Sequence, residues 1–354
     1  MRAILAGGGT GGHVIPALAI ANELRARYKW EVVFVGTARG IETRLVPAAG
    51  YELKLIEVSG YKGMSIAKRL KALWAVPSSV LASLRILRQF KPDVMIGVGG
   101  YASAPAMIAA GIVGVPSLVF EPNVVPGLAN RIAGKFAKIA AVHFEQTGRW
   151  FRRYEVTGVP VRDAFFHVPA KTDGPPTLLL FGGSQGARIL NRTMCDALPL
   201  VRERVPDIHI IHQTGQREFE QVRAAYETSG LSAQVSPFID DMPAAFAGAD
   251  AVLCRSGAST VAEIAAAGKA AIFVPFAAAA DQHQLRNAEL LAQKNAAELI
   301  PENELTPQRL VEAIASLLKD VPRRHAMEQA ARVLAHPNAA ARIAEMAVEI
   351  SKKS

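Results

Sequence analysis

Two glycine-rich turns, well over a hundred residues apart, each lie between a short apolar run and an amphipathic segment. Gly7–Gly12 (GGGTGG) follows the apolar run Arg2–Ala6, and Gly182–Ala187 (GGSQGA) follows Thr177–Phe181. A buried strand, a glycine turn and a helix form the opening unit of a Rossmann-like parallel sheet. A chain of 354 residues is long enough for two hydrophobic cores. The repeated opening therefore predicts two similar α/β halves.

A segment rich in glycine and proline separates the two openings. Gly158-Val159-Pro160-Val161-Arg162 interrupts the pattern of strands and helices, and a polar, proline-containing link follows over residues 169–176. Glycine and proline are the residues that most strongly punctuate regular structure. We therefore expect the hinge between the two halves near residue 160.

The first turn contains the G-x-G-x-x-G pattern of dinucleotide-binding folds, as Gly7, Gly9 and Gly12. In those folds an acidic residue at the end of the second strand binds the ribose hydroxyls. The corresponding stretch here, Val35-Gly36-Thr37, has no carboxylate. An NAD(P)-dependent oxidoreductase is thus a disfavoured alternative.

One histidine, His13, directly follows the first glycine turn. That position lies at the carboxyl edge of the expected parallel sheet, where open α/β sheets place their sites. An imidazole titrates near neutral pH and can therefore act as a general base. His13 is our candidate base, and a purely positioning role is the alternative.

The stretch Val252–Pro275 reads as strand, turn, helix and strand. Thr260 and Glu263 have the spacing of a capping box at the helix start, and Gly268 has the position of a C-cap glycine. A helix N-terminus suits an anion such as a diphosphate. Glu263 could accept hydrogen bonds from two ribose hydroxyls, and the alternative is that it only caps its own helix.

Polar side chains also follow two other expected strands. Glu121 and Asn123 come directly after the strand 117–120, and Asp281-Gln282-His283-Gln284 follows the strand that ends at Pro275. Carboxylate and amide groups at the carboxyl end of a parallel strand are placed like site residues. Glu121 is the second candidate base if His13 only positions the acceptor.

Charge and composition narrow the class of partner. The formal net charge is +9, which favours a polyanionic partner. We expect no nucleic acid, because aromatic residues are 6% of the chain and no nucleic-acid motif is present. Two cysteines fit a reducing compartment, and no signal peptide or membrane-spanning run is expected.

The segment Gly60–Lys91 interleaves basic and apolar residues at helical spacing. Lys68 and Lys71 alternate with Leu73 and Trp74, and we expect Pro77 to interrupt the helix. Such a segment can rest on an anionic membrane surface. A helix that faces the core with a solvated basic flank is the equal alternative, and a non-catalytic membrane adaptor is a further one.

Taken together, these motifs resemble the MurG family of bacterial N-acetylglucosaminyltransferases. The resemblance covers nearly the whole chain and depends on the order and spacing of its motifs, which are GGGTGGH (7–13), GGYAS (99–103), EPN (121–123), GVPVR (158–162), GGSQGA (182–187), FIDDM (238–242), SGASTVAEIAAAG (256–268) and DQHQLRNA (281–288).

The resemblance implies a GT-B fold, with two Rossmann-like parallel-sheet domains that face each other across a cleft. Residues 1–160 with 336–354 would form the acceptor domain and residues 161–335 the UDP-GlcNAc donor domain. The implied reaction is an inverting transfer of N-acetylglucosamine (GlcNAc) from UDP-GlcNAc to the 4-hydroxyl of the muramoyl sugar of lipid I. The product is lipid II for peptidoglycan, made at the cytoplasmic face of the inner membrane by a peripheral protein. Another UDP-sugar-dependent GT-B transferase with a lipid acceptor is the nearest alternative.

The resemblance also assigns roles to residues at matching motif positions. His13 is the candidate base, Glu263 would bind the uridine ribose, and Gln284 and Asn123 would bind the GlcNAc. The diphosphate or nearby atoms would be met by Thr10, Gly11, Gly12 and Ser184, and the nucleotide site would be lined by Arg162, Ile239, Ala258, Ser259, Thr260, Val261 and Ala262. No Asp-x-Asp motif occurs. We therefore expect no metal and no cofactor, with backbone N–H groups holding the leaving diphosphate.

Overall fold

The computed structural model describes residues 1–58, 66–279 and 282–352, with the backbone alone described for residues 66–76. The chain divides into two compact units. The N-terminal unit comprises residues 1–161 and 338–354, and the C-terminal unit comprises residues 162–337.

The N-terminal unit is built on a parallel sheet. Among its described residues the sheet has seven strands in the order β3-β2-β1-β4-β5-β6-β7. They are β1 (Arg2–Gly7), β2 (Glu31–Gly36), β3 (Glu52–Leu55), β4 (Val94–Gly99), β5 (Ser117–Glu121), β6 (Ile139–Val142) and β7 (Tyr154–Val156). The strand order reverses between β1 and β4, whose register pairs Gly7 with Gly99. This switch point is where open α/β sheets bind their ligands.

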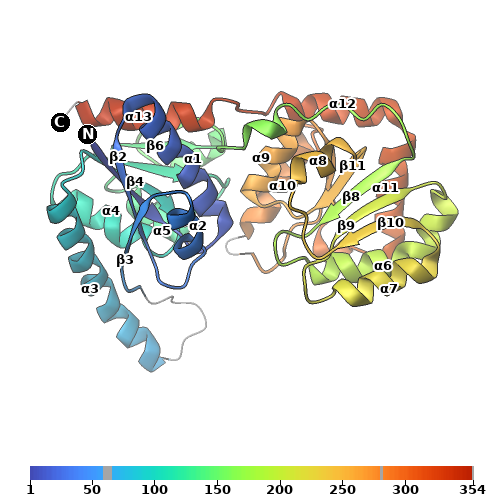
Figure 1. Ribbon diagram of the computed structural model, residues 1–354, viewed down its shortest axis with the longest axis horizontal. Helices are drawn as coiled ribbons and strands as arrows, with labels where there is room; N and C mark the ends of the chain where they lie inside the picture. Colours follow the sequence, from blue (N-terminus) through green and yellow to red (C-terminus); the bar gives the residue numbers. More distant parts are fainter. Residues whose placement is uncertain (59–65, 280–281, 353–354) are drawn as a thin grey trace. The chain divides into compact units, whose positions relative to one another are not determined.

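Helices cover both faces of this sheet. They are α1 (Gly11–Tyr28), α2 (Glu42–Ala48), α3 (Ile66–Phe90), α4 (Ser103–Ile112), α5 (Leu128–Ala133) and the C-terminal α13 (Ala339–Lys352). Helix α13 packs beside α1 on one face, and α3 packs beside α4 on the other (Figure 1). Arg342 of α13 binds Glu155 of β7 through Nε, at 2.5 Å, and through Nη2, at 2.9 Å.

The expectation that Pro77 interrupts its helix is wrong. Helix α3 continues through Pro77 to Phe90. Proline removes one N–H donor, and the intact turns on either side can tolerate that loss as a local distortion. The basic and apolar side chains at 62–76, on which the membrane interpretation depended, lie outside the described side chains.

The C-terminal unit repeats the architecture. Among its described residues six parallel strands run in the order β10-β9-β8-β11-β12-β13. They are β8 (Thr177–Phe181), β9 (His209–Gln213), β10 (Ser232–Ser236), β11 (Ala251–Cys254), β12 (Ala270–Phe273) and β13 (Glu298–Leu299). The order reverses between β8 and β11, so the second glycine turn also lies at a switch point.

Helices again cover both faces of the sheet. They are α6 (Arg188–Arg204), α7 (Phe219–Ser229), α8 (Met242–Ala247), α9 (Ala258–Ala267), α10 (His283–Gln293), α11 (Pro307–Lys319) and α12 (Val321–Arg332). Helix α11 packs against α6, and α12 packs against α9. The core between them includes Leu180, Met194, Leu253 and Ile314, each fully buried. The prediction of two Rossmann-like parallel-sheet domains is therefore confirmed.

No described helix is both long enough and apolar enough to cross a bilayer.

Candidate active site

His13 lies in the first turn of α1, at the switch point of the N-terminal sheet. Its Nδ1 is 3.2 Å from the carbonyl oxygen of Gly8 and 3.3 Å from Oγ1 of Thr10. The carbonyl oxygen can only accept, so the tautomer that satisfies it carries the proton on Nδ1. Nε2 is then the basic nitrogen. The ring edge with Nε2 lies against Gly99, where a Cβ would be only 3.0 Å from Nε2.

Glu121 is buried at the end of β5, with only 1% of its surface exposed. Its Oε1 accepts from the backbone N–H of Asn123 at 2.9 Å and from Nδ2 of Asn123 at 3.0 Å. Its Oε2 accepts from Nδ2 of Asn130 at 2.9 Å and from the N–H of Gly127 at 3.2 Å. Burial raises the pKa of the Glu121 carboxyl, and these hydrogen bonds oppose the rise. This geometry favours a structural role for Glu121, whose carboxylate holds the loop bearing Asn123. It disfavours a role as the base that takes a proton from a substrate.

Helix α9 starts three residues earlier than a capping box at Thr260 and Glu263 requires. In the described chain the N-cap is Gly257, without a side-chain capping bond, and Thr260 is the third helical residue. The capping-box prediction for Thr260 and Glu263 is therefore wrong, because the chain enters the helix at a glycine and Glu263 lies in the second turn. The C-cap prediction is confirmed, since Gly268 has φ 58°.

Glu263 is consequently available for another role. Burial raises the pKa of its carboxyl to about 7, while the positive charge of Arg162 acts in the opposite direction. Arg162 directly precedes a 3₁₀ turn (Asp163–Phe165), and its guanidinium carbon lies 5.1 Å from the centre of the Phe165 ring. A half-buried carboxyl with a perturbed pKa beside a cation is typical of a functional site.

The second glycine turn is held by side chains from β9 and α6. Nε2 of Gln213 donates to the carbonyl oxygen of Gly183 at 2.9 Å. Nδ2 of Asn191 donates to the carbonyl oxygen of Thr214 at 2.9 Å. Gly186 has φ +73°, and a Cβ there would be 1.9 Å from that same carbonyl oxygen. Only glycine fits at residue 186, and the turn therefore lies directly against the backbone of Thr214.

Gln284 is fixed by its neighbours at the start of α10. Its side-chain oxygen accepts from the N–H of Phe276 at 3.0 Å, and its carbonyl oxygen accepts from Oγ of Ser256 at 2.8 Å. Arg255 and Glu302 form a largely buried ion pair of 2.7 Å, and Glu302 also accepts from the N–H of Ala277 at 2.7 Å. This pair anchors the loop that follows β12.

The predicted site residues are divided between the two units. His13 and Thr10 meet around Gly8, and Glu121 holds Asn123, all in the N-terminal unit. In the C-terminal unit the members that retain exposed surface are Arg162, Ser184, Ile239, Ser259, Thr260, Glu263 and Gln284. Val261 is 1% exposed and packs into the core, so its side chain is not at a surface. Ala258 and Ala262 are also buried.

Several residues around these groups were not anticipated from the sequence. Glu42, Gln213 and the pair Arg255–Glu302 hold the turns and loops that carry predicted residues. Gln213 is the last residue of a strand, a position typical of site residues in parallel sheets, so the sequence could have marked it. Glu42 is the first residue of a helix that follows the second strand. Carboxylates are common at helix starts because of the helix dipole, so the sequence alone did not mark Glu42 as a site residue.

Within residues 1–58, 66–279 and 282–352, no cluster of three or more His, Cys, Asp or Glu side chains is placed to hold a metal ion.

Comparison with known proteins defines the class. Residues 3–142 match the Glycosyltransferase family 28 N-terminal domain, and residues 177–343 match the Glycosyltransferase family 28 C-terminal domain. The crystal structure of Acinetobacter baumannii MurG superimposes with a TM-score of 0.83 at 32% identity, covering 98% of this chain and 99% of that one. Fold and sites together therefore define a two-domain glycosyltransferase.

Two curated relatives narrow this class. The transferase of Syntrophus aciditrophicus is 46% identical over 333 residues, 91% of this chain and 92% of the relative. That of Anaeromyxobacter dehalogenans strain 2CP-1 is 45% identical over 359 residues, 100% of this chain and 94% of the relative. Both are named UDP-N-acetylglucosamine–N-acetylmuramyl-(pentapeptide) pyrophosphoryl-undecaprenol N-acetylglucosamine transferase. The chain belongs to this MurG family of N-acetylglucosamine transferases.

Proposed function

We propose that this chain transfers GlcNAc from UDP-GlcNAc to the 4-hydroxyl of the muramoyl sugar of lipid I, forming lipid II. The observation that carries the proposal is the 45% identity, over the whole chain, to a transferase named for these substrates. The N-terminal unit serves as the acceptor domain and the C-terminal unit as the donor domain.

The chemistry assigned to the N-terminal unit is deprotonation of the acceptor. Nε2 of His13 takes the proton of the 4-hydroxyl as that oxygen attacks the anomeric carbon of GlcNAc. The bond from this carbon to the diphosphate oxygen breaks, and UDP leaves with the electron pair. Attack from the face opposite the leaving group inverts the anomeric configuration. The Gly8 contact at 3.2 Å supports this role, because it keeps the proton on Nδ1.

The donor is assigned to the carboxyl edge of the C-terminal sheet. The start of α9 and the glycine turn held by Gln213 present N–H groups to the diphosphate. Glu263, on the second turn of α9, accepts from the ribose hydroxyls, with Arg162 nearby. Gln284 binds the sugar from the loop anchored by Arg255 and Glu302.

A direct transfer assay tests the reaction. The protein is incubated with UDP-GlcNAc and a short-chain lipid I analogue, and disaccharide product and UDP are measured. We expect equimolar formation of both. Turnover with a different UDP-sugar or a different lipid acceptor, but not with this pair, would favour the neighbouring class of GT-B transferases.

We further propose that an apolar surface on the N-terminal unit binds an anionic membrane at the cytoplasmic face. Ile112 is 62%, Val113 39% and Phe136 43% exposed, and Phe136 lies against Gly111. The exposed Lys135 and Lys138 flank Phe136. Apolar side chains framed by lysines match the interface of a bilayer with anionic headgroups.

Vesicle binding tests this surface. Ile112→Ser combined with Phe136→Ser is expected to weaken binding to vesicles with anionic phospholipid about tenfold or more, since each buried CH₂ contributes ~0.8 kcal/mol. Turnover of a short-chain soluble acceptor should stay unchanged. Val333→Ser, at an apolar residue of the C-terminal unit that is 84% exposed, is the matched control. Equal binding by the double variant and the control would refute this surface.

A further inference from the structure

Glu42, the first residue of α2, directs a buried carboxylate at the first glycine turn. It is 1% exposed. Its Oε2 accepts from the backbone N–H of Gly9 at 2.7 Å. Its Oε1 accepts from the N–H of Thr37 at 2.9 Å and from Oγ1 of Thr37 at 3.0 Å. The two oxygens thus have separate partners, one in the glycine turn and one at the end of β2.

Three glycines make the space that this carboxylate occupies. A Cβ on Gly8 would lie 2.3 Å from Cδ of Glu42, one on Gly40 1.9 Å from Oε2, and one on Gly36 2.7 Å from Cγ. Real Cβ contacts are not this short, so any side chain at these positions would displace the carboxylate. Glycines from the first turn, from the end of β2 and from the loop after β2 therefore all leave room for the Glu42 carboxylate.

The carboxylate and the histidine are joined through one peptide group. The N–H of Gly9 donates to Glu42, and the carbonyl of Gly8, in the same peptide unit, lies 3.2 Å from Nδ1 of His13. An ionised acceptor polarises the amide and strengthens the hydrogen bond at its other end. We propose that Glu42 is a positioning residue that orients His13 and raises its basicity through the Gly8–Gly9 peptide.

We call the path from Glu42 through the Gly8–Gly9 peptide to His13 the relay. Glu42 has the ionisation state that this relay requires. Burial acts to raise the pKa of its carboxyl, but hydrogen bonds from Gly9 and Thr37 outweigh burial and hold the pKa below its usual value. The carboxylate is therefore charged at neutral pH. The relay gives His13 the effect of a carboxylate partner without direct contact, and its catalytic consequence rests on the proposed role of His13 as base.

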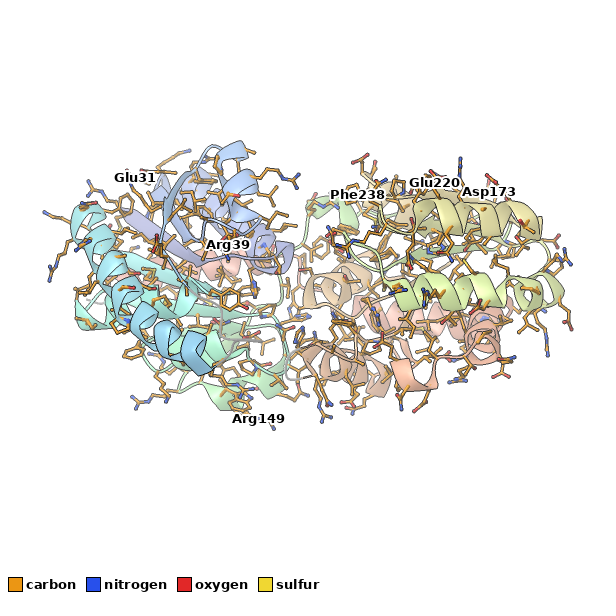
Figure 2. All side chains as sticks on the ribbon, turned by 90° about the horizontal axis from the view of Figure 1, so that it is seen from below. Glu31, Arg39, Arg149, Asp173, Glu220 and Phe238 are labelled. Atoms are coloured by element: carbon orange, nitrogen blue, oxygen red, sulfur yellow. The ribbon has the colours of Figure 1, made fainter. Side chains whose placement is uncertain are left out.

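Other charged groups of the N-terminal unit differ from Glu42 in exposure, in partner or in place. Arg39 and Arg44, in the loop before α2 and on α2, are exposed (Figure 2 labels Arg39). The carboxylate of Glu121, at the end of β5, is engaged by Asn123, Asn130 and Gly127. Arg342 of α13 pairs with the acidic residues Glu155, Glu345 and Glu349. Arg2 and Glu31 lie at the amino ends of β1 and β2, at the opposite edge of the sheet.

The relay also changes what the first glycine turn can bind. The N–H of Gly9 is engaged by a carboxylate, and that negative charge disfavours a second anion beside it. The resemblance assigned Thr10, Gly11 and Gly12 to the diphosphate or nearby atoms. Glu42 favours the neutral sugar hydroxyl as the group met by this turn, with the diphosphate at the turn 182–186.

The test is the pKa of the His13 imidazole, measured by NMR on histidine-labelled protein without substrate and assigned with His13→Gln. Glu42→Gln is expected to lower that pKa by about half a unit or more, because a neutral amide stabilises the imidazolium less. It should lower kcat about tenfold and shift the acidic limb of the pH–rate profile to lower pH, with little change in the KM for UDP-GlcNAc. Glu42→Asp, which keeps the charge, should recover part of both effects.

Thr37→Val is the matched control, because it removes the hydroxyl from Oε1 and leaves the Gly9 contact to Oε2. It is expected to lower thermal stability without moving the His13 pKa. An unchanged His13 pKa in Glu42→Gln, or an equal shift in Thr37→Val, would overturn the relay. A lowered His13 pKa with unchanged kcat would keep the relay and refute His13 as base. If Glu42→Gln does not fold, the relay is tested by comparing the His13 pKa in Glu42→Asp and in Thr37→Val. The shorter aspartate side chain moves the charge away from Gly9, so Glu42→Asp should still lower the His13 pKa, whereas Thr37→Val should not.

Discussion

Replacement of His13 by alanine is expected to lower kcat about 10²- to 10⁴-fold, the range for loss of a general base. The imidazole is held by the Gly8 carbonyl and Thr10 hydroxyl at the switch point of the N-terminal sheet. Binding of UDP-GlcNAc should change little, because the donor is assigned to the C-terminal unit. Steady-state kinetics with the short-chain acceptor, together with calorimetric binding of UDP, measure the two effects separately.

His209→Ala provides the control for removal of an imidazole. His209 starts β9, at the edge of its sheet opposite the site, and bonds to Oγ of Ser232 at 2.8 Å. Its loss should leave kcat within about twofold. A fall of less than tenfold in His13→Ala would remove His13 from the role of base and leave Glu121 as the next candidate, despite the hydrogen bonds that engage it.

Glu263→Gln is expected to raise the KM for UDP-GlcNAc about 10- to 100-fold, since hydrogen bonds to charged groups contribute about 1.5–3 kcal/mol. The KM for the lipid acceptor should stay within about twofold. Glu220→Gln is the matched control, because Glu220 is an exposed carboxylate on α7 of the same unit (Figure 2) and binds Arg223. Equal increases in both KM values would show that Glu263 maintains the fold of the unit and does not bind the ribose.

The pH dependence of donor binding gives an independent measure of the same group. Burial raises the pKa of Glu263 to about 7, so its carboxyl is mostly protonated below that pH. A protonated carboxyl offers fewer acceptor sites to ribose hydroxyls, so UDP affinity should fall as the pH drops from about 8 to 6. The loss should be smaller in Glu263→Gln. Titration of UDP itself is common to both proteins and cancels in the comparison.

The two-unit fold was predictable because its determinants are local. Each half opens with a strand, a glycine turn and a helix, and the short apolar runs that follow alternate with helical segments. The helix start at Ala258 was harder to predict from the sequence. Thr260 and Glu263 have a capping-box spacing, yet the N-cap is Gly257, three residues earlier than Thr260, because the chain enters the helix at a glycine without a capping side chain. Pro77 likewise did not end α3, since one missing N–H is tolerated within a long helix.

The site was only partly accessible from sequence, for a physical reason. His13, Glu121 and Glu263 can be selected by their position in the sequence, because each ends a strand or lies in the first two turns of a helix that follows a strand. The groups that hold the two glycine turns, in contrast, come from distant parts of the chain. Glu42 contacts Gly9, which is 33 residues away, and Gln213 contacts Gly183, which is 30 residues away. Such contacts depend on strand order, which local patterns do not encode.

We assign uridine diphosphate to the carboxyl edge of the C-terminal sheet and the acceptor to the first glycine turn. A crystal structure of the protein with UDP tests this assignment most directly. We expect the ribose hydroxyls within hydrogen-bond distance of Glu263 and the diphosphate at the turn around Ser184 and the start of α9. A diphosphate bound instead on the first glycine turn, beside Glu42 and His13, would contradict both the assignment of the donor and the relay to the base.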